Sequence, residues 1–358
     1  MSNIMKLKLL FLFLIAYSCF GQIPEYYSTI DFSQNGENLK NQLATLITTT
    51  HTTELVYTSG SSGLLDTWTV LKQSDLDLDN INNVLLIYGW NDDSTTVSEH
   101  RSRDVDESCH TSSCNGKWVR EHVFPRSIGT PNLGSEGAGS DAHNLKPIDS
   151  QRNNTRGNRL FGNANPSIPS HTISSNAWYP GDEWIGDVAR IIMYMYLRYP
   201  TQCEAINVAT GSVNFAPLGD MPDILLEWNA IDPPSDFEIN RNNVIAANQG
   251  NRNPFIDNPY LATLIWNGPQ ADDSWNVLNI NEVNSFAIKL YPTVTDGLVY
   301  IENSTSTNLQ YSLYNAMGQL LKENNMEKEI DLSNYSKGLY FIQVSNQGSN
   351  QTFKVVKN

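Results

Sequence analysis

The chain changes character near residue 268, and this change limits its fold more than any other feature. Beyond Phe286 the sequence consists of short runs in which apolar and polar residues alternate, for example residues 298–301 and 339–344. Turn dipeptides such as Asp296-Gly297 separate the runs. Alternation with a period of two buries one face of a strand, so about 70 residues of this pattern predict a small β-sandwich.

A different pattern precedes this tail. Apolar residues recur with helical spacing over residues 37–50 and again from about residue 186 to Pro200, whereas residues 84–88 form a short apolar run typical of a buried strand. Residues 127–140 are rich in Gly, Ser and Pro and indicate an exposed loop. We therefore expect an α+β chain, with a mainly helical first domain over residues 22–268, a linker over 269–284 and the sandwich over 285–358.

The first 21 residues are typical of a signal peptide. Lys6 and Lys8 precede an apolar stretch over residues 9–17, and cleavage after Gly21 would leave Gln22 as the first residue. The apolar stretch is too short to span a bilayer. A lipoprotein signal at a cysteine, Cys19, is the alternative. We expect an exported, monomeric protein without a stable membrane span.

Three cysteines remain after the signal peptide. Cys109 and Cys114 are close enough in sequence to close a small disulfide loop in an oxidising compartment. Cys203 is left over, either as a buried thiol or with a partner that the sequence does not identify. A zinc site on Cys109, His110 and Cys114 is an alternative, although the paired short spacings of structural zinc sites are missing.

The net charge of −15 argues against tight binding of nucleic acid. Residues 117–160 nevertheless carry seven basic residues against four acidic ones. An enzyme that turns over its substrate needs a locally attractive cleft rather than a basic surface. The charge therefore disfavours a tight nucleic-acid binder more than an enzyme that acts on nucleic acid.

Histidine is the usual general base near neutral pH, and this chain has only six histidines. His122 stands out because Glu121 precedes it and Arg120 and Arg126 flank it. Adjacent residues on a strand point to opposite faces, so Glu121 and His122 share a site only if the chain bends there. A partly buried histidine beside a surface glutamate is the alternative. The six histidines are His51, His100, His110, His122, His143 and His171.

A second segment, residues 141–158, contains residue types that suit a metal ion and a phosphate. Residues 141–147 alternate like a short strand, and residues 151–158 are helix-compatible as far as Gly157. On a helix, Asn153 and Arg156 share a face because they are three residues apart. Glu121 and Asn153 offer the oxygen ligands that magnesium prefers, with water in the other positions. An Asn-rich capped turn is the alternative.

Three segments in this order resemble the bacterial endonuclease I family, which belongs to the His-Me finger, or ββα-metal, nucleases. They are residues 120–127 (REHVFPRS), residues 140–147 (SDAHNLKP) and the pattern Asn153-x-x-Arg156-Gly157-Asn158. Residues 186–190, 232–235 and 249–257 are also similar to the family, so the resemblance covers roughly residues 22–266.

The resemblance implies a strand–loop–strand–helix finger around one divalent ion, which is Mg²⁺ or a related cation such as Mn²⁺ or Ca²⁺. His122 falls on the general base, and Glu121 and Asn153 fall on the metal ligands. We expect His143, on the second strand, to be structural or to face the substrate rather than to act as a second base. The residues expected to contact the substrate are Arg120, Arg126 and Arg156.

The tail resembles the type A C-terminal sorting domain of type IX secretion. The resemblance is carried by residues 290–297, 314–319, 330–333 and 336–341, although Thr293 and Val294 depart from the usual Asn-Pro. It implies that the type IX machinery is a partner and that the tail takes no part in catalysis. A generic carbohydrate- or partner-binding sandwich is the alternative.

These features predict a secreted endonuclease with little sequence specificity, which hydrolyses DNA and leaves 5′-phosphate ends; RNA is a further candidate substrate. A zinc hydrolase or protease is a second class, but no histidine lies four residues from another, as His-Glu-x-x-His would require. A non-catalytic surface adhesin is a third class, with which the acidic charge and the β tail would agree.

Overall fold

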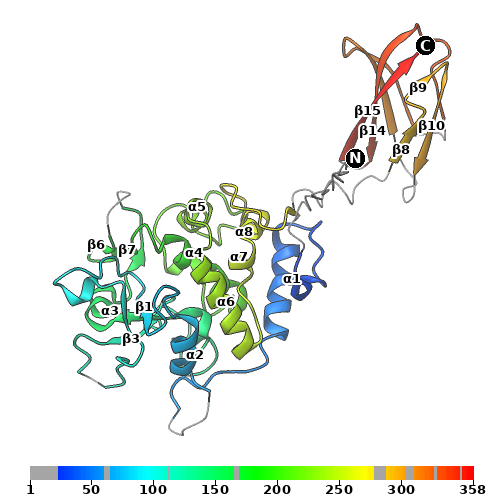
Figure 1. Cartoon of the computed structure of the whole chain (residues 1–358). Helices are drawn as coiled ribbons and strands as arrows, with labels where there is room; N and C mark the ends of the chain where they lie inside the picture. The colour runs from blue at the N-terminus through cyan, green and yellow to red at the C-terminus, as the bar shows by residue number, and fades with distance from the viewer. Residues whose placement is uncertain are drawn as a thin grey trace, which may run out of the picture. The chain divides into compact units, whose positions relative to one another are not determined.

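The chain forms two compact units, residues 1–276 and 277–358, and each is described by itself (Figure 1). The computed structural model describes residues 23–59, 65–111, 113–164, 169–277, 288–303, 310–325, 329–346 and 349–358. The predicted signal peptide and residues 278–284 of the predicted linker lie outside these ranges. Within them, no helix is long and apolar enough to cross a bilayer.

The first unit is built around one buried helix, α4 (Ile185–Arg198). Ile192, Met193, Tyr194 and Met195 are all buried, so this helix contacts protein on every side, and α1, α5 and α7 pack against it. The structure confirms the helices predicted over residues 37–50 and before Pro200. The remaining helices are α1 (Gly36–Thr49), α2 (Thr67–Ser74), α3 (Ser150–Arg156), α5 (Asp223–Ile231), α6 (Asp236–Gln249), α7 (Pro254–Asp257) and α8 (Tyr260–Trp266), with the 3₁₀ turns η1 (Glu25–Tyr27), η2 (Val97–Glu99), η3 (Gly137–Gly139), η4 (Ala142–Asn144) and η5 (Ala205–Asn207).

Small sheets complete the described part of the first unit. They pair β1 (Asn83–Leu85) with β2 (Ser102–Asp104), β3 (Trp118–His122) with β4 (Leu145–Asp149), and β5 (Leu160–Phe161) and β6 (His171–Ser174) with β7 (Ala177–Tyr179). β3 and β4 are antiparallel, with Glu121 opposite Lys146 and His122 opposite Leu145. α3 follows β4 without a connecting loop. The chain order is therefore strand, loop, strand, helix.

Two predicted strands differ from the structure. The run over residues 84–88 pairs as a strand only through Leu85, although the rest of the run stays buried. The strand expected over residues 141–147 begins only at Leu145. The reason is local, because the Asp141 carboxylate accepts the backbone N–H of His143 and so stabilises the turn η4. His143 thus lies on a 3₁₀ turn rather than on the second strand.

The domain boundary also differs from the predicted linker over residues 269–284. Ala271 and Trp275 are buried, and the Trp275 ring lies 4.7 Å from the ring of Tyr27. The backbone N–H of Tyr260 donates to the carbonyl of Asp272. Because Trp275 contributes a large apolar area to the core, the first unit continues to Asn276.

The second unit is a β-sandwich, as predicted from the alternating pattern. One sheet has the order β13-β10-β8 and the other β12-β11-β14-β15-β9. Val299 and Ile330 from the first sheet meet Leu313, Ile342 and Val355 from the second in one buried core. The strands are β8 (Ile288–Tyr291), β9 (Val294–Thr295), β10 (Leu298–Asn303), β11 (Gln310–Asn315), β12 (Leu320–Asn325), β13 (Glu329–Asp331), β14 (Gly338–Asn346) and β15 (Ser349–Lys357).

Candidate active site

The β3–β4–α3 segment is fixed by an aspartate at the junction of β4 and α3. Both oxygens of the Asp149 carboxylate are engaged: one accepts the backbone N–H groups of Gln151 and Arg152, and the other accepts Nη1 of Arg103 at 2.7 Å. The aspartate therefore caps the helix exactly where the strand ends. Gly157, with a φ of +58°, ends the helix. These contacts set the position of α3 against β3.

His122 lies at the end of β3 and is held by a backbone carbonyl. Its Nε2 is 2.9 Å from the carbonyl oxygen of Gly139, and its ring stacks on Tyr57 with the centroids 5.6 Å apart. A carbonyl oxygen only accepts, so Nε2 carries the hydrogen and Nδ1 of the neutral ring keeps its lone pair. Burial lowers the pKa of His122 to about 4, and the charges of Arg126 and Arg120 act in the same direction.

Glu121 lies next to His122 on β3, and the charge of Arg156 acts on both side chains. Oε1 of Glu121 accepts the hydroxyl of Tyr88 at 3.2 Å and lies 3.3 Å from Nε of Arg156 on α3. Only 2% of Glu121 is exposed. Burial raises the pKa of this carboxyl to about 7, although Arg156 and the Tyr88 hydroxyl both act to lower it. Glu121 is thus a buried acid whose negative charge is incompletely compensated.

Asn153 lies on α3, one turn before Arg156. The two residues are three apart on one helix, as predicted, but Arg156 is buried whereas Asn153 is partly exposed. Asn153 lines a cavity of about 530 Å³ whose lining is mostly polar, with Ser150, Gln151 and Asn154 among the other residues. Its side chain is therefore accessible to a bound group.

The arginines expected to contact the substrate divide into two kinds. The Arg120 guanidinium lies 3.5 Å from the centre of the Tyr57 ring and donates to Thr67 Oγ1 and to the carbonyl of Tyr57. Arg156 is 1% exposed and donates to the carbonyl of Val123. Arg126 is exposed; its Nε donates to the carbonyl of Leu133, and its guanidinium lies 5.5 Å from the centre of the Tyr57 ring. All three arginines therefore have protein partners, and of the three only Arg126 is exposed.

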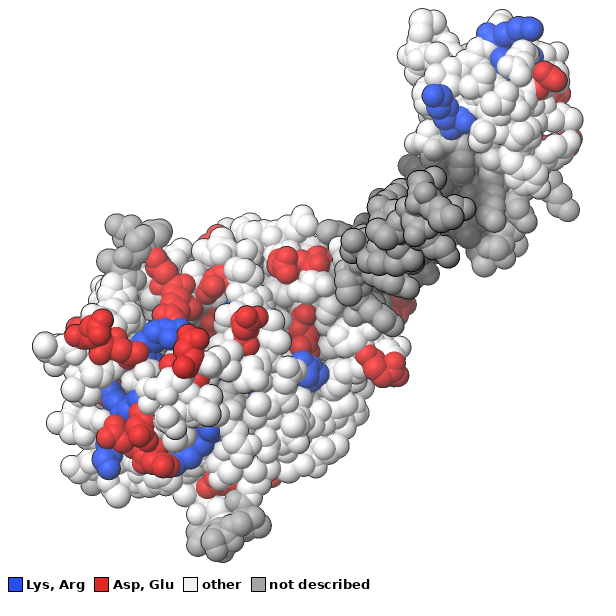
Figure 2. Space-filling view, in the orientation of Figure 1, with Lys and Arg blue, Asp and Glu red and all other residues white. Residues whose placement is uncertain are grey.

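Three of the seven basic residues in the stretch over residues 117–160 are buried, so only the other four can contribute to an attractive cleft. Lys146, Arg152 and Arg156 are all buried. Lys146 Nζ lies 3.0 Å from the carboxylate of Asp75, so its charge is compensated inside the protein. On the face of the first unit in Figure 2, acidic side chains are more frequent than basic ones.

A buried polar cluster supports the loop that carries Gly139. The Asp141 carboxylate accepts the hydroxyls of Tyr194 and Tyr199 through one oxygen and the side-chain amide of Gln249 through the other. His143 is fully buried, with Nε2 3.2 Å from the carbonyl of Asn251. His143 therefore does not face a substrate, and of the two roles expected for it only the structural one fits.

The cysteines form the predicted disulfide. Cys109 and Cys114 are bonded, with their Cα atoms 5.5 Å apart, and Cys203 is a buried free thiol. A disulfide removes both thiolates from the zinc alternative. Among the described residues, no three His, Cys, Asp or Glu side chains converge to hold a metal ion.

Sequence reasoning missed three residues that contact His122 or Glu121. Tyr57 stacks on His122, Gly139 accepts its N–H, and Tyr88 donates to Glu121. Tyr88 has a φ of +68°, a conformation that few residues other than glycine adopt and that often marks functional sites. These residues come from separate loops, and no local pattern links them to residues 121–122.

Comparison with known proteins finds family matches for both units of the chain. The family model for endonuclease I matches residues 35–260, and that for the secretion system C-terminal sorting domain matches residues 289–358. An extracellular ribonuclease of Bacillus subtilis (strain 168) is 36% identical over 255 residues, which is 69% of this chain and 80% of the relative. Another, from Bacillus amyloliquefaciens, is 38% identical over 209 residues, 56% of this chain and 66% of the relative.

These matches confirm the predicted nuclease class and the predicted secretion through the type IX pathway. They do not favour the adhesin or the zinc protease. The chain belongs to the endonuclease I family and carries a C-terminal sorting domain that directs its secretion.

Proposed function

We propose that the first unit is a His-Me finger nuclease that hydrolyses phosphodiester bonds in DNA and RNA, with His122 as general base and one divalent cation on Glu121 and Asn153. The observation that carries the proposal is the hydrogen bond between Nε2 of His122 and the carbonyl of Gly139. It fixes the tautomer in which Nδ1 can accept a proton. The strand–loop–strand–helix order of β3, β4 and α3 supports the same assignment.

The residues present fit a hard cation. The donors are one carboxylate and one amide oxygen, the ligand type that magnesium prefers, and Asn153 lines an open polar cavity. The buried Glu121 carboxyl, whose pKa burial raises to about 7, would gain the positive charge that Arg156 alone does not supply. When bound, such an ion stabilises the negative charge that builds up on the phosphate and on the leaving oxygen.

The protein's own residues carry out the proton transfer and the positioning. As a water oxygen bonds to phosphorus, Nδ1 of His122 takes one of the water protons. The bond from phosphorus to the 3′ oxygen breaks, and the released 3′ oxygen takes a proton from solvent water. The products implied by the family resemblance are a 5′-phosphate and a 3′-hydroxyl. The Gly139 carbonyl keeps the ring oriented while it becomes positively charged.

The arginines have different roles in this proposal. Exposed Arg126 contacts the substrate backbone, which makes binding dependent on salt. Arg120 holds the ring of Tyr57, against which His122 packs. Arg156 holds Glu121 from α3. Arg120 and Arg156 are thus positioning residues.

A comparison of two histidine variants tests the general base. His122→Ala should lower the rate of plasmid and RNA cleavage by about 10²- to 10⁴-fold, whereas His171→Ala, on β6, should cut normally. Circular dichroism and the melting temperature establish that both variants are folded. A near-wild-type rate for His122→Ala would exclude this assignment.

The cation is tested without relying on cleavage. Mg²⁺ should raise the melting temperature of the wild-type protein and EDTA should reverse the shift, because a ligand that binds only the folded state stabilises it. Glu121→Gln and Asn153→Ala should each reduce the shift. The same samples, given matched DNA and RNA strands, report which nucleic acid is cut faster. The two relatives are both named ribonucleases, so RNA is expected to be a substrate.

A further inference from the structure

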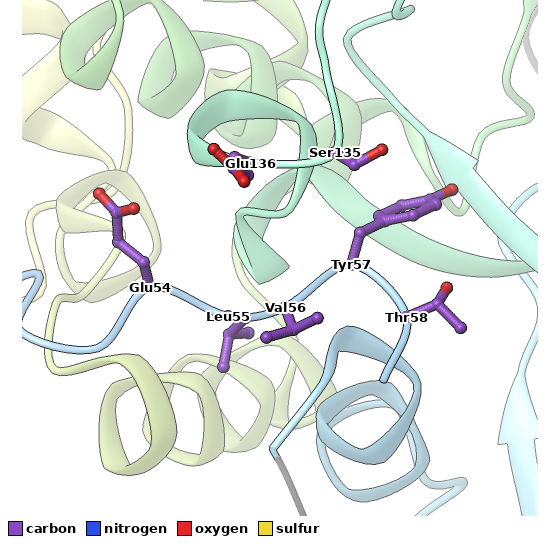
Figure 3. Close-up of a pocket in the computed structure, with 7 residues that line it drawn as sticks. All are labelled: Glu54, Leu55, Val56, Tyr57, Thr58, Ser135 and Glu136. Atoms are coloured by element: carbon purple, nitrogen blue, oxygen red, sulfur yellow. The ribbon is translucent and has the colours of Figure 1, made fainter. Parts of the chain in front are cut away.

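A second cavity, of about 430 Å³, is lined in part by Tyr57, the residue whose ring stacks on His122 (Figure 3). One wall is the extended segment over residues 54–58, and the other is the start of the turn that leads into η3. The lining residues are Glu54, Leu55, Val56, Tyr57, Thr58, Ser135 and Glu136.

Both walls of this cavity belong to segments that contact His122, the proposed general base. Tyr57 stacks on the His122 ring, and the segment that begins with Ser135 and Glu136 continues to Gly139, whose carbonyl accepts Nε2–H of His122. A group that occupies the cavity therefore contacts Tyr57, the residue that stacks on the histidine proposed to activate water. In a polymeric substrate, such a group belongs to a nucleotide next to the cleaved bond.

The chemistry of the lining selects the part of the nucleotide. Figure 3 shows Glu54 and Glu136 from opposite walls at one end of the cavity, and Tyr57, Thr58 and Ser135 at the other. Two carboxylates repel a phosphodiester. The side chain of Val56 is 44% exposed and, with the ring of Tyr57, offers an apolar surface to a planar group. The occupant should be a neutral, planar group with N–H donors, which describes a nucleobase.

The bases differ in what they offer to a carboxylate. Guanine has two neighbouring donors, N1–H and the 2-amino group, on its Watson–Crick edge. Adenine and cytosine have one amino group beside a ring nitrogen that only accepts, and uracil has one N–H between two carbonyls. Ionised carboxylates are acceptors only, so guanine matches them best.

We propose that this cavity binds guanine of a nucleotide adjacent to the cleaved bond, with Glu54 and Glu136 accepting its N1–H and 2-amino groups. The inference rests on the proposed nuclease function and names a base preference within it. The Watson–Crick edge is free only in unpaired strands, so the preference applies to single-stranded substrate. It modifies the expectation of little sequence specificity.

Cleavage of defined strands by the purified full chain tests this preference. The substrates are single-stranded RNA oligomers of uridine with one central guanosine, inosine, adenosine or cytidine. We expect wild-type protein with Mg²⁺ to cut next to guanosine about tenfold faster than next to uridine, because one well-placed pair of hydrogen bonds discriminates bases by this order. Inosine lacks the 2-amino group and should lie between the two.

Matched glutamine variants assign the effect to the cavity. In Glu54→Gln and Glu136→Gln the ratio of cutting at guanosine to cutting at uridine should fall towards one. Glu25→Gln, an exposed residue of η1 outside this cavity, should keep the wild-type ratio. Equal cutting next to every base by the wild-type protein, or an unchanged ratio in both cavity variants, would overturn the proposal.

Binding of free nucleosides separates this inference from the proposed mechanism. Calorimetry without any divalent ion should detect guanosine binding to the wild-type chain, tighter than uridine by about tenfold and weakened in Glu136→Gln. Guanosine that binds no better than uridine would refute the cavity assignment even if cleavage follows the mechanism above. Selective binding by a protein in which His122→Ala still cuts would refute only the general base.

Discussion

Asp75 offers a sharp test of how the core supports the candidate site. Its carboxylate is fully buried, and its Oδ1 lies 3.0 Å from both Nε of Arg241 and Nζ of Lys146, which are buried as well. Arg241 also donates to the carbonyls of Ala142 and Leu145, which flank the start of β4. Asp75→Asn keeps the shape of the side chain but leaves the buried Arg241 without its anion and Lys146 with only Asp187, at 3.8 Å.

The expected loss of stability in Asp75→Asn follows from the burial of these ion pairs. Removal of one partner from a buried ion pair typically destabilises a protein by about 3–5 kcal/mol. For a domain of this size, each kcal/mol lowers the melting temperature by roughly 2–4 °C, so the expected decrease is roughly 6–20 °C. Differential scanning calorimetry measures it, and Asp79→Asn, an exposed residue that follows α2, is the matched control. A decrease for Asp75→Asn no larger than that of the control would refute the reasoning.

The same residue predicts an effect of pH. Burial alone would raise the pKa of Asp75, but the charges of Arg241 and Lys146 outweigh it and hold the pKa below its ordinary value. A depressed pKa in the folded state contributes stability above the unfolded pKa of about 4, and this contribution is lost as the pH falls through the lower, folded value. The difference in stability between wild type and Asp75→Asn should therefore shrink below about pH 4. A difference that is constant down to pH 2 would contradict this assignment.

Other predictions concern the disulfide, Glu121 and the tail. Replacement of Cys109 and Cys114 by serine should lower the free energy of unfolding, measured in urea, by about 2 kcal/mol, because the small loop is no longer closed in the unfolded chain. An unchanged free energy of unfolding would contradict a stabilising role of this disulfide. Tyr88→Phe, which removes a donor to Glu121, should lower the cleavage rate about tenfold with unaltered circular dichroism, and a rate within twofold of wild type would argue against this role. Removal of residues 277–358 should leave the specific nuclease activity unchanged, and a large loss would place the sandwich in catalysis.

Local patterns were sufficient where the structure depends on local periodicity. The alternation after Phe286 determined the sandwich, and the apolar spacing before Pro200 determined helix α4, because burial of one strand face or helix stripe is written into neighbouring residues. The Cys109–Cys114 disulfide followed from its short spacing. Where a polar side chain competed with the pattern, as Asp141 does at η4, the predicted strand was wrong.

The candidate site was likewise predicted from sequence only where its residues lie in short local segments. The sequence by itself placed His122, Glu121 and Asn153 in motifs of a nuclease family, since those residues lie in short segments. Only the tertiary structure decided which basic side chains are buried in ion pairs, because Arg156 and Lys146 pair with buried acids that are distant in sequence. Likewise, the contacts that orient His122 come from loops around residues 57 and 139, and packing of the whole first unit brings those loops together.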